Sequence, residues 1–472
     1  MTCVRVTSAS GRWGTEAQRT HCREGEAGHN VLLKGKMEDT PRSQTVSTKL
    51  QQIAEQAKRY PGTAFTTLVH LIDVDFLREA FRRTNKKSSP GIDGVTAERY
   101  AENLDENLRD LYERLRSGQY RAMPVERVWL DKEDGSKRPI GKPVLEDKIV
   151  QRAVAMLLEA VYEQDFYDFS YGFREGRSPH QALHELRERC MGMKVGWMVD
   201  LDVCGFFDNL EHEKLREILK QRVNDGGIIR LIGKWRNAGV IDGEDLIYPE
   251  KGSPQGSVIS PALANVFLHH VLDDWFEREV KPRMKGPVFL IRFADDGVIG
   301  CVLEEDARRI MEVLPKRFGR FGLVVHPEKT KMVRFKQPNK WEATDKENGA
   351  VDFLGFTHYW AKSRQGNWVV KRKTAKKRLR RAMKMFWQWC RQNRHLPLKE
   401  QHEQLCQKLR GYYQYYAVRD NMRMLRKVHR HVERAWRHWL SRRSRKSKIP
   451  WKECNKLWKH YPLPIPRIIH AI

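Results

Sequence analysis

Two adjacent aspartates, Asp295 and Asp296, separate the apolar runs 288–293 and 297–303, which are typical of two strands joined by a hairpin. Burying both charges without a counter-ion is costly, and a divalent cation removes that cost. An ordinary polar turn is the alternative, because Asp-Asp before glycine is common in turns. The dipeptide alone therefore leaves both interpretations open.

A further acidic group ends another β-rich run, residues 196–203. Asp202 stands near the end of this run, where it would complete a carboxylate cluster with the hairpin. Such a cluster suits Mg²⁺, which prefers oxygen ligands and keeps waters for substrate phosphates. Asp200 alternates with Asp202 on the same face of a strand, so spacing alone does not decide which of the two is the ligand.

The surrounding sequence must fold so that these acids meet. Apolar residues at three- and four-residue spacing predict helices, and short β-rich runs bounded by turns predict strands. Their order lacks regular β-α-β repetition, so we expect an α+β fold. Strand signals fade after about residue 370, where helical patterns rich in Lys, Arg and Trp begin. The predicted helices cover residues 72–84, 96–117, 145–163, 178–190 and 261–279, and the predicted strands cover 125–130, 196–203, 288–293, 297–303 and 330–335.

The N-terminal residues 1–44 are rich in Gly, Ser, Thr and charge and lack periodicity, which predicts a disordered tail. Met37 fits a translation start, and Ser47 precedes a helical pattern through Leu50 and Ile53. We therefore expect a chain of residues 37–472 to keep full activity.

Positive charge is concentrated at one end of the chain. Of the net charge of +28, residues 361–472 carry +27, from 32 Lys and Arg against five acids, whereas residues 1–360 hold 56 bases and 55 acids. So many uncompensated charges repel one another unless a polyanion binds, which indicates a nucleic-acid partner. The aromatic residues interleaved with them fit base stacking, although core packing is the better interpretation for each one singly.

Composition excludes several classes of protein. With 472 residues, 40% of them hydrophobic, the chain can bury a sizeable core. No stretch reaches 18 uncharged apolar residues and no signal-peptide pattern is present, so we expect no membrane association and no secretion. The eight cysteines are scattered without metal-ligand spacing, as is typical of a reducing compartment. These features predict a cytoplasmic protein.

Eight motifs follow one another along the chain: GIDGVT (91–96), DGSKRPIGKPVLEDKIVQRAV (134–154), YGFREGRS (171–178), DVCGFFDNL (202–210), GSPQGSVISPALANVFLH (252–269), RFADDGVIG (292–300), HPEKTK (326–331) and FLGF (353–356). Together they resemble the successive sequence blocks of reverse transcriptases encoded by bacterial group II introns. The resemblance runs from about residue 65 to 440. It implies a right-hand polymerase with a small antiparallel palm sheet, followed by an all-α thumb. The implied parts are an N-terminal extension at 45–85, fingers and palm at 86–360, a helical thumb or maturase (X) domain at 361–440 and a basic segment at 441–472.

The resemblance implies an RNA-directed DNA polymerase and a maturase that binds group II intron RNA to assist splicing and mobility. An RNA template, a DNA primer and dNTPs would be its substrates, with two Mg²⁺ ions, or Mn²⁺ instead, as cofactors in the cytoplasm of a bacterium. Two alternatives stay open: a splicing cofactor that only binds RNA, and a free-standing reverse transcriptase recruited for defence or repair. The oligomeric state stays open as well.

Roles for individual residues follow from the same resemblance, position by position. Asp202, Asp295 and Asp296 would hold the metal ions, and alignment on the Phe-Phe-Asp triplet at 206–208 selects Asp202 over Asp200. The peptide carbonyl of Val203 would help to hold the second ion.

Other residues would handle the nucleotide. Lys132 and Arg138 match residues that grip the triphosphate, and Gln255 matches a residue that lines the nucleotide site. Phe207 stands where the family has an aromatic barrier against a ribose 2′-hydroxyl, and Lys329 where a lysine protonates the departing pyrophosphate. Without the resemblance, a charged surface turn is the better interpretation of Lys132 and Arg138. Ordinary core packing explains Phe207 as well as a barrier does.

The last quarter of the chain carries the motif LRGYYQYY (409–416), which resembles the signature of the maturase-specific thumb. FLGF resembles a loop that braces the primer terminus, through Phe353, Leu354, Gly355 and Phe356. Many relatives continue into an endonuclease with His and Cys clusters; only Cys454 lies in the last sixty residues here, so we expect none. The residues expected to contact RNA phosphates are Lys371, Arg372, Lys373, Lys376, Lys377, Arg378, Arg380 and Arg381.

Overall fold

The computed structural model describes residues 40–472 apart from 132–136, 208, 244, 249–255, 340–347 and 444–448, with side chains from residue 45 onward except that of Asp131. The chain divides into two units, Met1–Pro41 and Arg42–Ile472, and the sheets that position the candidate site belong to the second. No helix in the described ranges is both long enough and apolar enough to cross a membrane.

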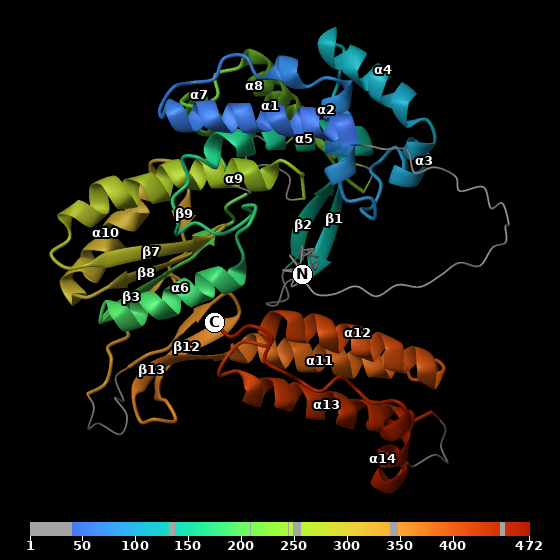
Figure 1. The fold of residues 1–472 in the computed structure, drawn as a ribbon, viewed down its shortest axis with the longest axis vertical. Coiled ribbons are helices and arrows are strands. Elements are labelled where there is room, and N and C mark those ends of the chain that lie inside the picture. The colour runs from blue at the N-terminus through green and yellow to red at the C-terminus, as the bar shows by residue number, and fades with distance from the viewer. Residues whose placement is uncertain are drawn as a thin grey trace, which may run out of the picture. The chain divides into compact units, whose positions relative to one another are not determined.

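Strands from the middle of the sequence form a four-stranded antiparallel sheet in the order β10-β3-β8-β7, which we call the central sheet; Figure 1 labels β3, β7 and β8. Its strands β7 and β8 are buried along nearly their whole length, as strands covered on both faces are. Helix α6 packs against β7, and α10 packs against β3 and β8. The strands are β3 (Trp197–Leu201), β7 (Val288–Phe293), β8 (Asp296–Cys301) and β10 (Lys331–Arg334), and the helices are α6 (Pro179–Gly192) and α10 (Glu304–Gly319).

Local sequence explains where the two covering helices begin. Ser178 caps α6 and exchanges hydrogen bonds with Gln181 in a capping box, and Pro179 takes the first helical position, where it loses no hydrogen bond. Helix α10 opens with three acids, which favour the positive end of its dipole.

A second sheet, in the order β2-β1-β5-β6, takes β1 and β2 from before strand β3 in the sequence and β5 and β6 from after it, and is antiparallel except between β1 and β5. Helix α2 packs against α4 and α5, and one hydrophobic cluster joins these helices to α10. The elements here are α1 (Thr40–Arg59), α2 (Val74–Arg83), α3 (Ala97–Glu102), α4 (Leu104–Arg116), β1 (Val125–Asp131), β2 (Lys137–Lys142), α5 (Leu145–Tyr162), β4 (Val203–Cys204), α7 (His212–Lys220), α8 (Gly226–Asn237), β5 (Val240–Asp242), β6 (Asp245–Ile247), α9 (Ser260–Leu268), two π-helical stretches at His269–Asp274 and Phe276–Val280, short 3-10 turns at Val69–Leu71 and Lys281–Arg283, and β9 (Val324–Val325).

The C-terminal part begins with a three-stranded antiparallel sheet, β11-β12-β13, and continues as helices. Helix α13 packs against α11 and α12 around a separate hydrophobic core that includes Leu409, Val432 and Trp436. The elements are β11 (Val351–Phe353), β12 (Phe356–Lys362), β13 (Trp368–Thr374), α11 (Lys376–Gln392), α12 (Leu398–Tyr416), α13 (Met422–Leu440) and α14 (Trp451–His460).

The mixed α/β fold with small antiparallel sheets is confirmed, and each predicted helix and strand overlaps an element of the same type. Three details are wrong. Ser47 does not start a helix, because α1 already begins at Thr40; residues 40–44 are therefore helical, and the rest of the predicted tail lies outside the described residues. The continuous α-helix expected over 261–279 turns π-helical at His269. The helical region begins at Lys376 rather than at 361, because β13 extends to Thr374.

Candidate active site

The paired aspartates lie at the turn between β7 and β8, as their setting between two apolar runs predicts. Phe293 pairs with Asp296, which leaves Ala294 and Asp295 as the two residues of the turn. Ala294 has a left-handed backbone with φ of 57°, which a non-glycine residue adopts only when its surroundings impose it. Asp295 is half-buried, and Asp296 as a whole residue keeps contact with solvent, although protein atoms surround its carboxylate.

Asp202 follows the last residue of β3, on the strand next to the hairpin. Leu201 pairs with Gly297 in an antiparallel register, so Asp202 lies opposite Asp296. Two hydrogen bonds to the Thr330 hydroxyl fix its backbone: the hydroxyl accepts from the Asp202 N–H at 3.1 Å and donates to the Asp202 backbone carbonyl at 3.2 Å. Asp200 lies opposite Val298, two pairs further from the turn than Asp202.

These acids repel one another. Desolvation by the surrounding protein, followed by the charges of Asp295, Asp202 and Asp200, raises the pKa of Asp296 to about 7. Desolvation is also the main reason why the pKa of Asp295 is raised. Crowded carboxylates whose ionised forms are disfavoured are what a divalent cation stabilises, so charge and donor type fit magnesium.

The side chains do not form a closed ligand set as they stand. Within the described residues, no three Asp, Glu, His or Cys side chains are grouped closely enough to hold a metal ion. Asp202 instead forms an ion pair with Lys329, with 3.1 Å between its Oδ2 and the lysine Nζ. A cation shared by all three acids would replace this ion pair.

Part of the chain is similar to a known protein family. Residues 130–358 match the family described as reverse transcriptase (RNA-dependent DNA polymerase). These residues form a reverse transcriptase domain. It contains the central sheet and all three acids, and ends within β12.

Curated relatives resemble the chain over about half of its length. Protein YkfC of Escherichia coli is 35% identical over 231 residues, which cover 48% of this chain and 61% of YkfC. The group II intron-encoded protein LtrA of Lactococcus lactis is 34% identical over 227 residues, covering 47% of this chain and 37% of LtrA. A mitochondrial nuclear intron maturase of Arabidopsis thaliana is 30% identical over 91 residues, which cover 19% of this chain and 12% of the relative. The matches thus cover less than two thirds of each relative.

The other residues that the sequence suggests for a nucleotide site differ in burial and in the elements that carry them. Arg138 is exposed on β2, and its charge acts to lower the pKa of Asp295. Val203 is buried in β4, where it pairs with Val325 of β9. Phe207 is half-buried, with its ring edge-on to that of Phe206 at a centroid distance of 5.2 Å. Lys132 and Gln255 lie outside the described residues.

The FLGF motif forms the tight turn between β11 and β12. Phe353 pairs with Phe356, and Leu354 and Gly355 both have positive φ, of 48° and 78°. Two such residues in succession are typical of a type I′ hairpin, in which glycine is favoured. The YYQYY end of α12 supports the turn, because the Tyr415 hydroxyl donates a hydrogen bond of 2.8 Å to the Leu354 carbonyl.

Only part of the expected RNA-contacting run is exposed. Arg372 is fully buried, so its expected contact with phosphate is wrong; strand alternation along β13 turns Val370, Arg372 and Thr374 inward. The Arg372 guanidinium donates to the carbonyl oxygens of Leu183 and Ile472. Arg378 is half-buried near the acids and acts to lower the pKa of Asp296, and Lys371 is half-buried too. The exposed members are Lys373, Lys376, Lys377, Arg380 and Arg381.

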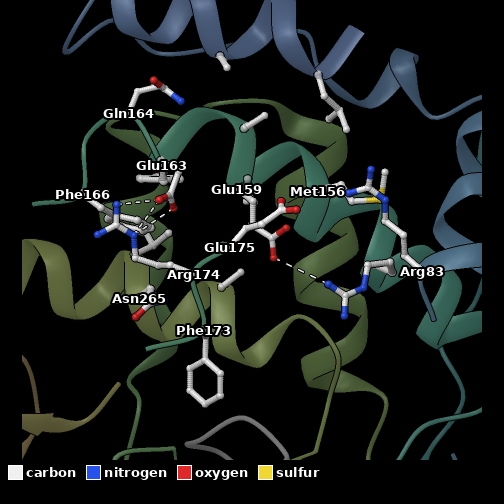
Figure 2. A pocket seen from close by; sticks show the side chains of 18 residues that line it. Arg83, Met156, Glu159, Glu163, Gln164, Phe166, Phe173, Arg174, Glu175 and Asn265 are labelled. Carbon is white, nitrogen blue, oxygen red and sulfur yellow. Dashed lines mark hydrogen bonds and ion pairs between the residues drawn. The ribbon is translucent and has the colours of Figure 1, made fainter. Parts of the chain in front are cut away.

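A cavity of about 510 Å³ lies away from the three acids, among α1, α5, α9 and the segment after α5 (Figure 2). Opposite charges pair across it, between Arg174 and Glu163 and between Arg152 and Glu159. None of the three acids lines it. Asn265, one of its lining residues, accepts a hydrogen bond from the guanidinium of Arg292 in β7, so the wall of the cavity is connected to the strand that carries the acidic turn.

Proposed function

We propose that this protein is an RNA-directed DNA polymerase and a group II intron maturase. The observation that carries the proposal is the convergence of Asp202, Asp295 and Asp296 on adjacent strand ends inside a reverse transcriptase domain. The similarity to LtrA supports the intron assignment. In this interpretation, residues 86–360 are fingers and palm, preceded by an extension at 45–85 and followed by a thumb from 361 to 440 and a basic segment to 472. The relatives from two bacteria favour the bacterial cytoplasm as its location.

The chain's own residues divide the work. The three carboxylates and the Val203 carbonyl would hold two Mg²⁺ ions, which when bound lower the pKa of the primer 3′-hydroxyl and neutralise the triphosphate. Arg138, exposed beside Asp295, would grip the triphosphate together with Lys132. Lys329, 64% exposed and 3.1 Å from Asp202, would donate a proton to the departing pyrophosphate.

RNA binding would involve more of the surface than the sequence indicated. Besides the exposed lysines and arginines of α11, helix α13 exposes a row of arginines three or four positions apart, so these arginines share one face. This row, which we call the α13 stripe, consists of Arg423, Arg426, Arg430 and Arg434. We propose that the exposed lysines and arginines of α11, together with the α13 stripe, bind the phosphates of intron RNA.

A primer-extension assay tests the proposal. With an RNA template, a DNA primer, dNTPs and Mg²⁺, we expect full-length DNA, and chelation of Mg²⁺ should stop its synthesis. Splicing of a group II intron RNA, measured in parallel, separates the two activities. Splicing without extension would favour the RNA-binding cofactor, and extension without splicing a free-standing polymerase.

Replacing Phe207 by alanine tests the sugar barrier. Because Phe207 lies half-buried next to the Asp202 strand end, removing its ring should open space for a 2′-hydroxyl. We expect ribonucleotide use relative to deoxynucleotide use to rise by about 10-fold to 100-fold, as for other pocket-shape changes. The measurement is kcat/KM for ATP and dATP. Phe207→Tyr keeps the ring and should keep the discrimination; equal ratios in the wild type and Phe207→Ala would make Phe207 simple core.

A further inference from the structure

Arg292 is a fully buried arginine in β7, two residues before the turn that carries Asp295. A guanidinium has five N–H donors, and here all five are used. Nε and Nη2 donate to the two carboxylate oxygens of Asp273, at 2.7 and 2.5 Å; Nη2 also donates to the Ser170 hydroxyl at 2.7 Å; Nη1 donates to the Asn265 side-chain oxygen at 3.1 Å and to the Ala294 carbonyl at 2.9 Å.

The last of these bonds reaches the strained residue of the active site. Ala294 is the residue with φ of 57°, and its carbonyl belongs to the peptide that leads into Asp295. Gly172 also packs closely against this turn, because a Cβ added at Gly172 would lie only 2.1 Å from the Ala294 nitrogen. Asn265 connects Arg292 to Gly172: its side-chain oxygen accepts from Arg292, and its amide donates to the Gly172 carbonyl at 2.7 Å.

The partners of Arg292 come from one helix and one loop. Asn265 lies on α9, and Asp273 lies in the π-helical stretch that continues it, with a carboxylate that is fully buried. The π form is rare and often marks functional sites, because it changes which side chains share a face. Ser170 belongs to the segment between α5 and α6, which also forms an isolated bridge with Arg292.

We propose that Arg292, together with Asp273, Asn265 and Ser170, is a positioning unit that sets the Ala294 conformation and thereby the place of the Asp295 and Asp296 carboxylates. The inference rests on the proposed function. Apolar residues of similar volume often stabilise a core as well as a buried ion pair does, so stability alone gives little reason for an arginine here. This guanidinium instead uses its planar fork to bind three side chains and one backbone carbonyl at once, which a lysine with three donors does not reproduce.

A matched pair of variants tests the proposal. Arg222 is the control: it is also buried, forms a two-bond ion pair with Asp165 and donates to the backbone oxygens of Ala57, Tyr60 and Thr63. Arg292→Lys and Arg222→Lys keep the charge and should lower the melting temperature comparably. Only Arg292→Lys should also lower kcat for primer extension by about 100-fold, the scale of a small misplacement of reacting groups.

Mg²⁺ affinity gives a readout that does not need polymerisation. From the increase in melting temperature as Mg²⁺ is titrated, we expect about tenfold weaker binding by Arg292→Lys and unchanged binding by Arg222→Lys. If the wild type binds Mg²⁺ but extends no primer, the proposed function fails while this comparison still stands. Equal Mg²⁺ affinity in both lysine variants overturns the positioning role.

A milder variant covers the case in which Arg292→Lys does not fold. Asn265→Ala removes one acceptor from Arg292 and the bond to Gly172, but leaves the ion pair with Asp273 intact. It should weaken Mg²⁺ binding and slow extension in the same direction. Wild-type affinity and rate in this variant would overturn the proposal as well.

Discussion

Asp295→Asn should abolish primer extension, lowering kcat by about 10³-fold or more, the upper range for removing one preorganised electrostatic group. Asparagine keeps the size of the side chain but loses the negative charge that a divalent cation requires. RNA binding and assisted splicing should persist, because the basic surface lies on other elements. Single-turnover extension and a filter-binding assay measure the two effects.

Asp200→Asn is the matched control for this experiment. Desolvation raises the pKa of Asp200 to about 6, yet this residue lies opposite Val298, further from the turn than Asp202. We expect the activity of the Asp200→Asn variant to stay within about tenfold of wild type, because this change acts on the metal-binding carboxylates only through their charges. Loss of activity in Asp200→Asn with activity retained in Asp202→Asn would reverse the assignment that spacing left open.

The same carboxylates should reduce stability when no cation is bound. The folded state raises the pKa of Asp296 to about 7, above the usual value of a free aspartate. Its ionised form therefore opposes folding, and this cost grows as the pH rises from about 4 to about 7. In chelator at neutral pH, Asp296→Asn should therefore melt a few degrees above wild type, and added Mg²⁺ should stabilise the wild type more than the variant.

Removing the α13 stripe should weaken RNA binding by about 10²-fold at physiological salt. The variant changes all four arginines of the stripe to glutamine. Arginines three or four residues apart repeat about every 4.5 to 6 Å along a helix, roughly one per turn, and so form a continuous row of positive charge. The slope of log K against log salt should fall by about one for each phosphate that the variant no longer neutralises.

The control removes the same number of charges elsewhere. Lys58, Arg99, Arg109 and Arg116 are exposed on α1, α3 and α4, and glutamines there lower the net charge equally. If binding depended only on net charge, both variants would lose the same affinity. Extension of a short primer at saturating template should survive in the stripe variant, because Asp202, Asp295 and Asp296 are untouched.

Much of the candidate site could be predicted from local patterns. Two acids between apolar runs predicted a hairpin turn, and an acid after a β-rich run predicted a neighbouring strand end; both predictions concern a few consecutive residues. The choice between Asp200 and Asp202 could not be made that way, because they share a face. Strand register decides which one is nearer to Asp296.

Other features depend on contacts between distant segments. Arg292 stands inside an apolar run, but nothing near it in the sequence indicates which residues it contacts. Its partners Ser170, Asn265 and Asp273 come from two other parts of the chain. Arg372 was expected to face RNA because its neighbours are basic, yet the alternation of β13 turns it inward. Basic composition predicts a partner's charge well, but it does not predict which face a single side chain takes.

The hydrogen bond from Tyr415 to Leu354 joins the last helical turn of α12 to the β11–β12 hairpin. Packing of Tyr416 against Phe356, with ring centroids 5.3 Å apart, makes a second connection at the same place. These two contacts connect the end of α12 to the hairpin. If a primer-template duplex binds to the C-terminal helices and its growing end contacts this hairpin, movement of the duplex by one nucleotide would be coupled to release of the growing end.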